Sequence, residues 1–191
     1  MTVIDMHLHI ESRSSCSILK VEELFDNLSP RIEGICITDH EILKPIKKLY
    51  IPERRILFGV ELRSDLGDIL AYGLENLPSK GLNPRQTIKF IHQQNGVAVC
   101  AHPFSNRHLA FGEKVYDYNF DAIEINGAIG KQANKRAKEA ATIMNLPIIG
   151  GSDAHSKEQL NTIATKFQNE ITSITEIVHA IKNGECEVIR V

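Results

Sequence analysis

The chain has 191 residues, of which 42% are hydrophobic and 24% are charged, and its formal net charge is -2 at pH 7. This length and this apolar fraction suffice for a buried core, so we expect a single domain over residues 1–191 and exclude wholesale disorder. The balance of 22 Lys and Arg residues against 24 Asp and Glu residues excludes the basic excess of a general nucleic-acid or membrane-surface binder. We therefore expect no stable nucleic-acid partner and no membrane partner.

The cysteines and the first residues favour a cytoplasmic location. Cys16, Cys36, Cys100 and Cys186 lie far apart and form no CxxC pair, which is typical of reduced thiols rather than of a disulfide framework. No apolar run approaches the ~20 residues of a membrane span, and the first residues lack the pattern of a signal peptide. The sequence leaves the oligomeric state open.

Short β-branched runs alternate with segments of helical period along most of the chain. The runs that we expect to form strands are 3–6, 34–37, 56–60, 68–72, 97–100, 122–125 and 147–150. The segments that we expect to form helices are 20–28, 84–95, 131–145 and 173–183. Most of the strand runs are continuously apolar, which is typical of parallel strands covered on both faces. The repeated strand–helix order predicts an α/β fold with a parallel sheet, either open or closed into a barrel.

Histidines and carboxylates follow the ends of these expected strands. The residues concerned are His7 and His9, Asp39 and His40, Glu61, His102, and Asp153 and His155. They include five of the eight histidines of the chain. Because the carboxyl ends of parallel strands share one face, where active sites are built, we expect these side chains to gather there.

The imidazoles and carboxylates expected at this face are the ligands of zinc, manganese and iron ions. His7 and His9 are two residues apart on an extended segment, so both point to one side and can chelate one ion. The same holds for Asp153 and His155. More than four ligands indicate more than one ion, and a carboxylate such as Glu61 can bridge two ions about 3.5–4 Å apart. Bound ions lower the pKa of a water to near 7 and neutralise a phosphoryl group, so the residues alone predict metal-assisted hydrolysis.

Five short motifs occur in a fixed order that spans nearly the whole chain. They are His7-Leu8-His9, Ile37-Thr38-Asp39-His40, Gly59-Val60-Glu61, Ala101-His102-Pro103 and Gly151-Ser152-Asp153-Ala154-His155. As an ordered set, they resemble the motifs of the PHP family, named for polymerase and histidinol phosphatase domains. The resemblance implies a distorted seven-stranded (β/α) barrel with two or three divalent metal ions at the C-terminal ends of the strands. It also implies phosphoester hydrolysis as the usual activity.

The resemblance further implies how the ligands are shared among the ions. The first ion would be held by His7, His9, Glu61 and Asp153. Glu61 would bridge to a second ion that His102 also binds. His40 and His155 would hold a third ion.

Two positions depart from the family pattern. Where the family commonly has another histidine for the second ion, this chain has Asp68, which we expect to replace it; a cap on the turn after Gly67 is the alternative. In the loop after the first motif the family often has an acidic or histidine ligand, and here Cys16 is the only strong ligand nearby. An ordinary small loop residue explains Cys16 equally well, so the filling of the third site stays open. Asp39 is expected to fix the loop or a neighbouring histidine rather than to bind metal.

Several side chains near the motifs are candidates for contact with the substrate. Arg63 and Arg107 are candidate phosphate holders, with a solvated loop charge as the alternative for both. Asn126 follows its strand and can reach the same face, and His108 is a candidate for the rim. His40 and His155 are the candidate catalytic acids, since an imidazole not fully committed to metal can protonate the leaving group.

These expectations combine into a metal-dependent phosphoesterase that hydrolyses a small phosphate ester, a phosphomonoester or a nucleotide, with a metal-bound hydroxide. Its partner would be a small phosphorylated substrate. One alternative is a metallohydrolase that acts on a different ester or an amide, because the metal cluster itself does not select phosphorus. The other alternative is a metal-binding or regulatory module without activity. The sequence leaves open the substrate, the choice between mono- and diesters, and the identity of the metal.

Overall fold

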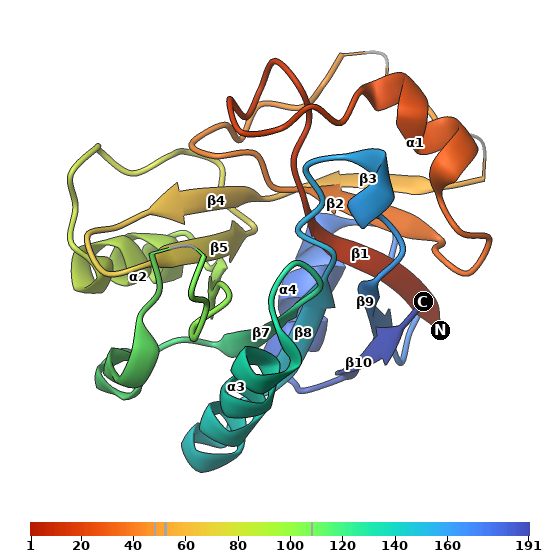
Figure 1. Ribbon diagram of the computed structural model, residues 1–191. Coiled ribbons are helices and arrows are strands. Elements are labelled where there is room, and N and C mark those ends of the chain that lie inside the picture. Colours follow the sequence, from red (N-terminus) through yellow and green to blue (C-terminus); the bar gives the residue numbers. More distant parts are fainter. Residues whose placement is uncertain (48, 52, 108) are drawn as a thin grey trace.

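The computed structural model describes residues 1–47, 49–51, 53–107 and 109–191, and their strands form two five-stranded sheets (Figure 1). The first sheet has the order β10-β9-β1-β2-β3 and the second has the order β4-β5-β6-β7-β8. The first is built from β1 (Thr2–Leu8), β2 (Gly34–Ile37), β3 (Arg55–Phe58), β9 (Ile163–Phe167) and β10 (Cys186–Arg190). The second is built from β4 (Val60–Arg63), β5 (Asp68–Tyr72), β6 (Val97–Cys100), β7 (Ala122–Asn126) and β8 (Ile148–Gly151).

The α-helices of the described residues lie where the sequence predicts them. They are α1 (Val21–Asn27), α2 (Pro84–Gln93), α3 (Lys131–Met144) and α4 (Ile174–Lys182). Two short 3₁₀ helices cover Gly112–Asp117 and Lys157–Gln159. None of the helices in this described part has the length and hydrophobicity to cross a lipid bilayer.

Local sequence explains how two of these helices begin. The Asn83 side chain accepts a hydrogen bond from the backbone N–H of Gln86, and the Gln86 side chain accepts one from the N–H of Asn83. Pro84 occupies the first turn of α2, where its missing N–H is not needed. Ser173 and Glu176 form the same reciprocal cap at the start of α4.

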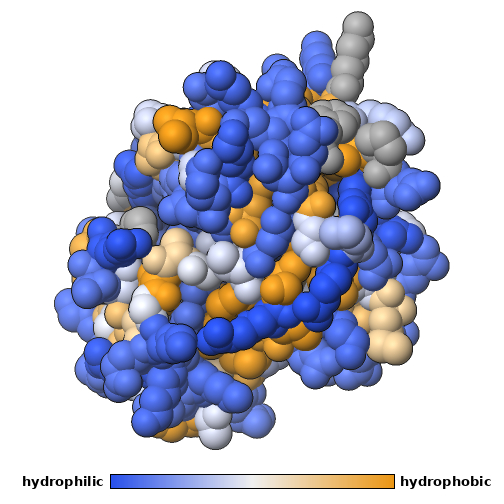
Figure 2. All heavy atoms as spheres, turned by 45° about the vertical axis from the view of Figure 1, so that its right-hand side comes forward, coloured by the Kyte–Doolittle hydropathy of each residue, from blue (hydrophilic) through white to orange (hydrophobic). Residues whose placement is uncertain are grey.

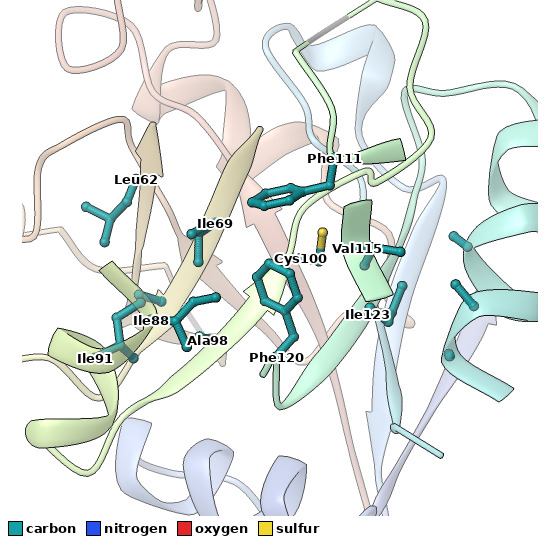
Figure 3. Packing of buried hydrophobic residues seen from close by; sticks show 14 of the residues in the cluster. Leu62, Ile69, Ile88, Ile91, Ala98, Cys100, Phe111, Val115, Phe120 and Ile123 are labelled. Carbon is teal, nitrogen blue, oxygen red and sulfur yellow. The ribbon is translucent and has the colours of Figure 1, made fainter. Parts of the chain in front are cut away.

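Helices α2 and α3 cover the outer face of the second sheet. In Figure 3, Ile88 and Ile91 of α2 point toward Ile69 and Ala98 on the sheet. Phe111 and Phe120 pack edge to face beside Cys100, with ring centroids 5.1 Å apart. Buried aliphatic and aromatic side chains of this kind supply most of the favourable free energy of folding. Because side chains alternate along a strand, the residues between those of this layer point to the inner face of the sheet. The polar residues of these strands therefore face inward.

The expected α/β class is confirmed, but the strands are not all parallel. Neighbours β1, β2 and β3 are parallel, as are β6, β7 and β8. In contrast, β5 runs antiparallel to both β4 and β6, and β9 runs antiparallel to both β1 and β10. The start of β5 therefore lies at the same edge as the ends of its neighbours. Strands β9 and β10 were not predicted, because polar or charged residues interrupt the apolar residues of both.

The two sheets meet through isolated bridges at two seams. At the first seam, Leu8 pairs with Ala154, and the N–H of Asp153 donates to the backbone oxygen of His7 at 2.7 Å. At the second seam, His40 pairs with Glu61. Below the first seam, the Tyr72 hydroxyl crosses from the second sheet and donates to the backbone oxygen of Met6 at 2.8 Å. The seams thus bring the ends of the expected motifs together.

The surface is predominantly hydrophilic on the face seen in Figure 2, with hydrophobic atoms in small separate areas. Ile18, Tyr50 and Ile143 are among the exposed large apolar side chains. Scattered apolar residues of this kind are normal on a protein surface.

The close contact at the first seam requires glycine at position 151. A Cβ atom there would lie 2.5 Å from the backbone nitrogen of His7 and would also meet the His7 Cβ atom. Since these are main-chain and Cβ atoms, they cannot rotate away. Gly130 provides a matched control, because its added Cβ would meet nothing within 4 Å.

We predict that Gly151→Ala separates β1 from β8 and lowers the free energy of unfolding by about 1–3 kcal/mol, the usual range for overpacking. Gly130→Ala is expected to leave the free energy of unfolding nearly unchanged. Urea unfolding followed by circular dichroism measures both variants. Equal stability of the two variants would show that the seam tolerates the extra methyl group.

Candidate metal centre

The candidate metal ligands gather at the edge where the two sheets meet. They are His7, His9, His40, Glu61, Asp68, His102, Asp153 and His155, which form three groups with ligand atoms within 4.8 Å of one another. Two of the groups share His9, and Glu61 links the third group to them through its contacts with His9 and His40. They come from β1, β4, β5 and the segments that follow β1, β2, β6 and β8. Asp68 reaches this edge because β5 begins where the neighbouring strands end.

Four ligand atoms surround one point at the first seam. The His7 and His9 Nε2 atoms are 3.0 Å apart, and each lies 3.4 Å from Asp153 Oδ1. Glu61 Oε2 lies 3.4 Å from His7 Nε2 and 3.1 Å from His9 Nε2. Two atoms that share one ion at ~2.1 Å in tetrahedral geometry are about 3.4 Å apart. The spacing therefore fits a single tetrahedral ion.

Glu61 presents its other oxygen to a second group. Glu61 Oε1 lies 3.2 Å from His102 Nε2, which in turn lies 3.8 Å from Asp68 Oδ2. One carboxylate thus faces two ligand groups through two different oxygens. This is the arrangement that a bridging ligand between two ions requires.

His40 and His155 form a third group with His9. The His9 ring centroid is 4.6 Å from that of His40 and 4.4 Å from that of His155. His40 Nδ1 lies 3.1 Å from Glu61 Oε2 but makes no hydrogen bond with it, and the atom is buried. A buried nitrogen without a hydrogen bond costs free energy, whereas a bound cation would engage it. The donor set and this nitrogen both fit a divalent ion.

Protons balance the charges of this cluster in the metal-free protein. Burial lowers the pKa of His7, but the charges of Glu124, Asp153 and Glu61 outweigh it and raise the pKa well above its usual value. Burial also lowers the pKa of His102, yet the hydrogen bond and charge of Glu61 raise it to about 9. Burial alone would raise the pKa of Glu61, but the charge of His7 and the surrounding imidazoles hold it well below its usual value. Protonated imidazoles therefore face ionised carboxylates.

The outer members of the cluster are shifted in the opposite direction. Burial lowers the pKa of His40 to about 4 and also lowers that of His155. Burial and the charge of Glu61 raise the pKa of Asp68 to about 7. At neutral pH His40 and His155 are therefore uncharged, as metal-ligating imidazoles must be.

Two of the candidate ligands have strained backbones. The φ angle is 28° at His102 and 54° at Asp153, in a region that residues with a Cβ rarely adopt. Strain of this kind costs about 1–3 kcal/mol per residue and is concentrated at functional sites. The surrounding structure must therefore hold both residues in place.

An open cavity of about 340 Å³ lies over the cluster. Its lining consists of Cys16, His40, Glu61, Arg63, Ser64, Asp68, His102, Leu109, Asp153 and His155. Arg63, a candidate for contact with the substrate, lines this cavity and is exposed. Cys16 also lines the cavity, but it does not belong to the three ligand groups found among the described residues.

The structure places the other expected contact residues elsewhere. Arg107 is exposed, and its guanidinium donates to the backbone oxygen of Ala128 at 3.2 Å. Asn126 was expected to contact the substrate, but it is fully buried, and its amide donates to Asp153 Oδ2 at 3.1 Å. Asn126 therefore lies behind a candidate ligand rather than in the cavity. His108 lies outside the described residues.

Two buried carboxylates support the histidines from behind. Glu124 Oε1 accepts a hydrogen bond from His7 Nδ1 at 2.7 Å. Asp39 acts through Ser14, whose hydroxyl lies 3.1 Å from His9 Nδ1 and donates to Asp39 Oδ1 at 2.8 Å. Such partners fix the orientation of ligating imidazoles. The arrangement agrees with the expectation that Asp39 fixes a neighbouring histidine.

The sequence analysis missed Glu124 and Ser14. Glu124 is a charged residue inside an apolar strand run, at an inward-facing position of β7. An ionised carboxylate at such a position needs partners, so the period-2 pattern of β7 carried a usable signal. Ser14 lies in a serine-rich loop and offered no signal of that kind.

Comparisons with known proteins find a family match over part of the chain and several structures of the same fold. A family model described as PHP-associated matches residues 131–186. An uncharacterized protein of Methanocaldococcus jannaschii, MJ1587, is 32% identical over 103 residues, which cover 51% of this chain and 59% of that protein. The match thus spans about three fifths of the length of this relative.

Several solved structures share the fold. PsfC from Pseudomonas syringae gives a TM-score of 0.77 at 17% identity and covers 100% of this chain and 91% of its own. A two-domain protein from Bacteroides vulgatus contains a predicted PHP-like metal-dependent phosphoesterase. It gives a TM-score of 0.73 at 18% identity, and the match covers 98% of this chain and 64% of that protein. An amidohydrolase from Chromobacterium violaceum gives a TM-score of 0.66 at 15% identity, and the match covers 98% of this chain and 97% of that protein. At these identities the likeness shows a common fold. The family-model match adds that residues 131–186 are similar to the PHP-associated family.

The raised pKa values predict that a metal ion competes with protons for the cluster. Below pH 9 the ion must displace a proton from His102, whose pKa is about 9, and above it no such proton remains. Metal affinity should therefore rise with pH up to at least about 9, with protons released on binding. Calorimetric titration with Mn²⁺ in two buffers of different ionisation enthalpy counts these protons.

His92 provides the control for this titration, since it pairs with Asp121 outside the cluster. The variant His92→Gln should release the same number of protons as the original chain. A metal affinity that is independent of pH over this range, without proton release, would contradict the pKa shifts.

Proposed function

We propose that this chain is a metal-dependent hydrolase, and more finely a phosphoesterase that acts on a small phosphate ester. The observation that carries the proposal is the buried Glu61 carboxylate, which faces two groups of ligand atoms through its two oxygens at the floor of an open cavity. A structural ion pair would not need four imidazoles around one carboxylate, whereas two adjacent metal-ion sites need this many ligands.

The proposed cofactors are two or three divalent ions of zinc, manganese or iron. The residues for the first are His7, His9, Glu61 and Asp153. Glu61, Asp68 and His102 would hold the second, and His40 and His155 the third. Bound ions supply a water of lowered pKa and neutralise charge on the transferring group.

The remaining residues of the cavity would bind and orient the substrate. Arg63 is an exposed cation at the lining, and its planar guanidinium suits two phosphate oxygens at once. The lowered pKa values of His40 and His155 disfavour the role of proton donor at neutral pH and support their role as ligands.

The finer fold assignment is also a proposal. We infer a distorted (β/α)7 barrel in which β1, β2, β4, β5, β6, β7 and β8 form the ring. Its support is that isolated bridges join β1 to the segment after β8 and the segment after β2 to β4. In this arrangement β9 and β10 are not members of the ring; β9 pairs with β1, and β10 pairs with β9.

Hydrolysis of an amide or of a non-phosphate ester is the second candidate function. One solved structure with the same fold is an amidohydrolase, and the ligand groups themselves do not select phosphorus. The Arg63 cation at the cavity lining favours the phosphate ester.

The first test is metal content by elemental analysis, on protein purified without chelator or histidine tag. We expect two to three equivalents of metal per chain, and His9→Ala should lose most of them because His9 belongs to two of the three groups. His92→Ala is the matched control, since this histidine lies on α2 away from the cluster. Less than half an equivalent after incubation with excess metal would refute the metal centre.

The second test separates the two hydrolase classes with a panel of phosphate monoesters, phosphate diesters and carboxylic esters. We predict that Arg63→Ala raises KM for phosphate esters about 10-fold, which corresponds to the loss of a charged hydrogen bond. The variant Arg63→Lys should restore part of this loss because it keeps the charge. Turnover of carboxylic esters alone, unaffected by Arg63→Ala, would favour the second candidate function. Bound metal with no turnover of any ester would favour the regulatory module.

A further inference from the structure

We propose that Glu124 and Asn126 are positioning residues that hold three metal ligands supplied by other strands. Both lie on β7, a strand that contributes no candidate ligand among the described residues. Both are fully buried. The proposal rests on the metal centre proposed above and assigns the task of preorganising it to β7.

The Glu124 carboxylate accepts three hydrogen bonds. Oε1 accepts from His7 Nδ1 at 2.7 Å, while Oε2 accepts from the backbone N–H of His102 at 2.8 Å and from Asn126 Nδ2 at 3.0 Å. A buried ionised carboxylate is tolerated when its oxygens are engaged in this way. One side chain therefore ties β1, β6 and β7 together.

Each bond to Glu124 constrains a ligand. Because His7 Nδ1–H donates a hydrogen bond to Glu124, the Nε2 atom is the one that faces Glu61 and Asp153. Nε2 can offer its lone pair to an ion once its own proton is displaced. The bond to the N–H of His102 holds a residue whose φ angle of 28° is strained. Without that bond, relaxation of the backbone would move the His102 ring.

Asn126 orients a further ligand, which follows a fourth strand, β8. Its amide nitrogen carries two hydrogens and donates to Glu124 Oε2 and, at 3.1 Å, to Asp153 Oδ2. Asp153 is thereby oriented with Oδ1 toward His7 and His9. The amide cannot rotate, since its own oxygen accepts from the N–H of Ala128 at 2.8 Å.

Helix α3 anchors this strand end from outside. The Asn134 side chain accepts from the backbone N–H of Asn126 at 2.9 Å and donates to the Asn126 backbone oxygen at 2.7 Å. Both backbone groups at the end of β7 are thus paired. The chain of contacts runs from α3 through Asn126 and Glu124 to His7, His102 and Asp153.

Glutamine at position 124 keeps the size of the side chain but removes one acceptor. Its amide nitrogen would face at least one of the three donors now bonded to the carboxylate, so at least one of these bonds must break. Removing a carboxylate behind a ligating histidine costs about 10–100-fold in metal affinity. We expect Glu124→Gln to weaken Mn²⁺ binding by a factor in this range.

The matched control is a second carboxylate on the approach to the same strand. Asp121 accepts from His92 Nε2 at 2.8 Å and from the backbone N–H of Ala98 at 2.7 Å, just before β7 begins. It makes bonds of the same kinds as Glu124 at the opposite end of β7. Asp121→Asn should leave Mn²⁺ affinity within about twofold of the original chain, a change too small to mark a lost ligand partner.

The experiment measures Mn²⁺ affinity by calorimetry, the visible absorption spectrum of the Co²⁺-loaded protein, and the Tm of the metal-free protein. For Glu124→Gln we expect weaker Mn²⁺ binding and an altered Co²⁺ spectrum, because the geometry of the ligands changes. The spectrum reports on coordination itself, which a purely structural role would not alter.

Asn126→Leu keeps the hydrogen bond between His7 and Glu124 but removes those of the Asn126 amide to Asp153, to Glu124 and to the N–H of Ala128. It therefore tests the proposal if Glu124→Gln does not fold. We expect it to weaken Mn²⁺ binding about 10-fold, the lower end of the range for such partners. Affinity and spectrum equal to the original chain in both variants would overturn the positioning role alone. Failure of the original chain to bind Mn²⁺, Co²⁺ or Zn²⁺ would overturn the metal centre and the positioning role together.

Discussion

The arrangement of the site depends on the charge of one buried carboxylate. Glu61 is 1% exposed and has imidazole nitrogens of His7, His9, His40 and His102 within 3.4 Å of its oxygens. An isolated ion at this depth would cost several kcal/mol, so the surrounding groups must compensate it. Protons on imidazoles provide this compensation in the metal-free protein, and divalent cations would provide more of it. The negative charge of Glu61 thus explains why so many nitrogen atoms point to one place.

Most of the residues around Glu61 lie close to the two seams, where the first sheet meets the second. Ladder hydrogen bonds hold each sheet internally, whereas the sheets are joined by isolated bridges and single hydrogen bonds such as that from the Tyr72 hydroxyl to Met6. At the first seam the backbone leaves its regular geometry, as the positive φ angle of Asp153 shows. Irregular backbone directs side chains into the space between sheets, and buried side chains such as Glu124 then replace the missing ladder contacts. The site and the connection between the sheets are therefore the same structure.

Much of this was readable from the sequence, because strand ends are marked by a change from apolar to polar residues. The residues from His7 to His155 that follow such changes all reach one edge. The position of Asp68 could be found only by resemblance, since the antiparallel direction of β5 is set by tertiary pairing and not by its own residues. The true place of Asn126 also depends on a neighbour, Asp153, which lies 27 residues away. Spacing along the chain identifies polar strand ends, but it does not decide which of them face solvent.

The first sheet is made from both ends of the sequence, and this affects how the protein folds during synthesis. Thr2 of β1 pairs with Phe167 of β9, while the strands of the second sheet follow one another between residues 60 and 151. The second sheet can therefore form while the C-terminal part of the chain is still in the ribosome. In contrast, β1 must wait for more than 160 residues to emerge before β9 can cover it. Contacts between such distant segments form slowly, so His7 and His9 reach Asp153 late in folding. Until then a metal ion would find only part of its ligands on a nascent chain.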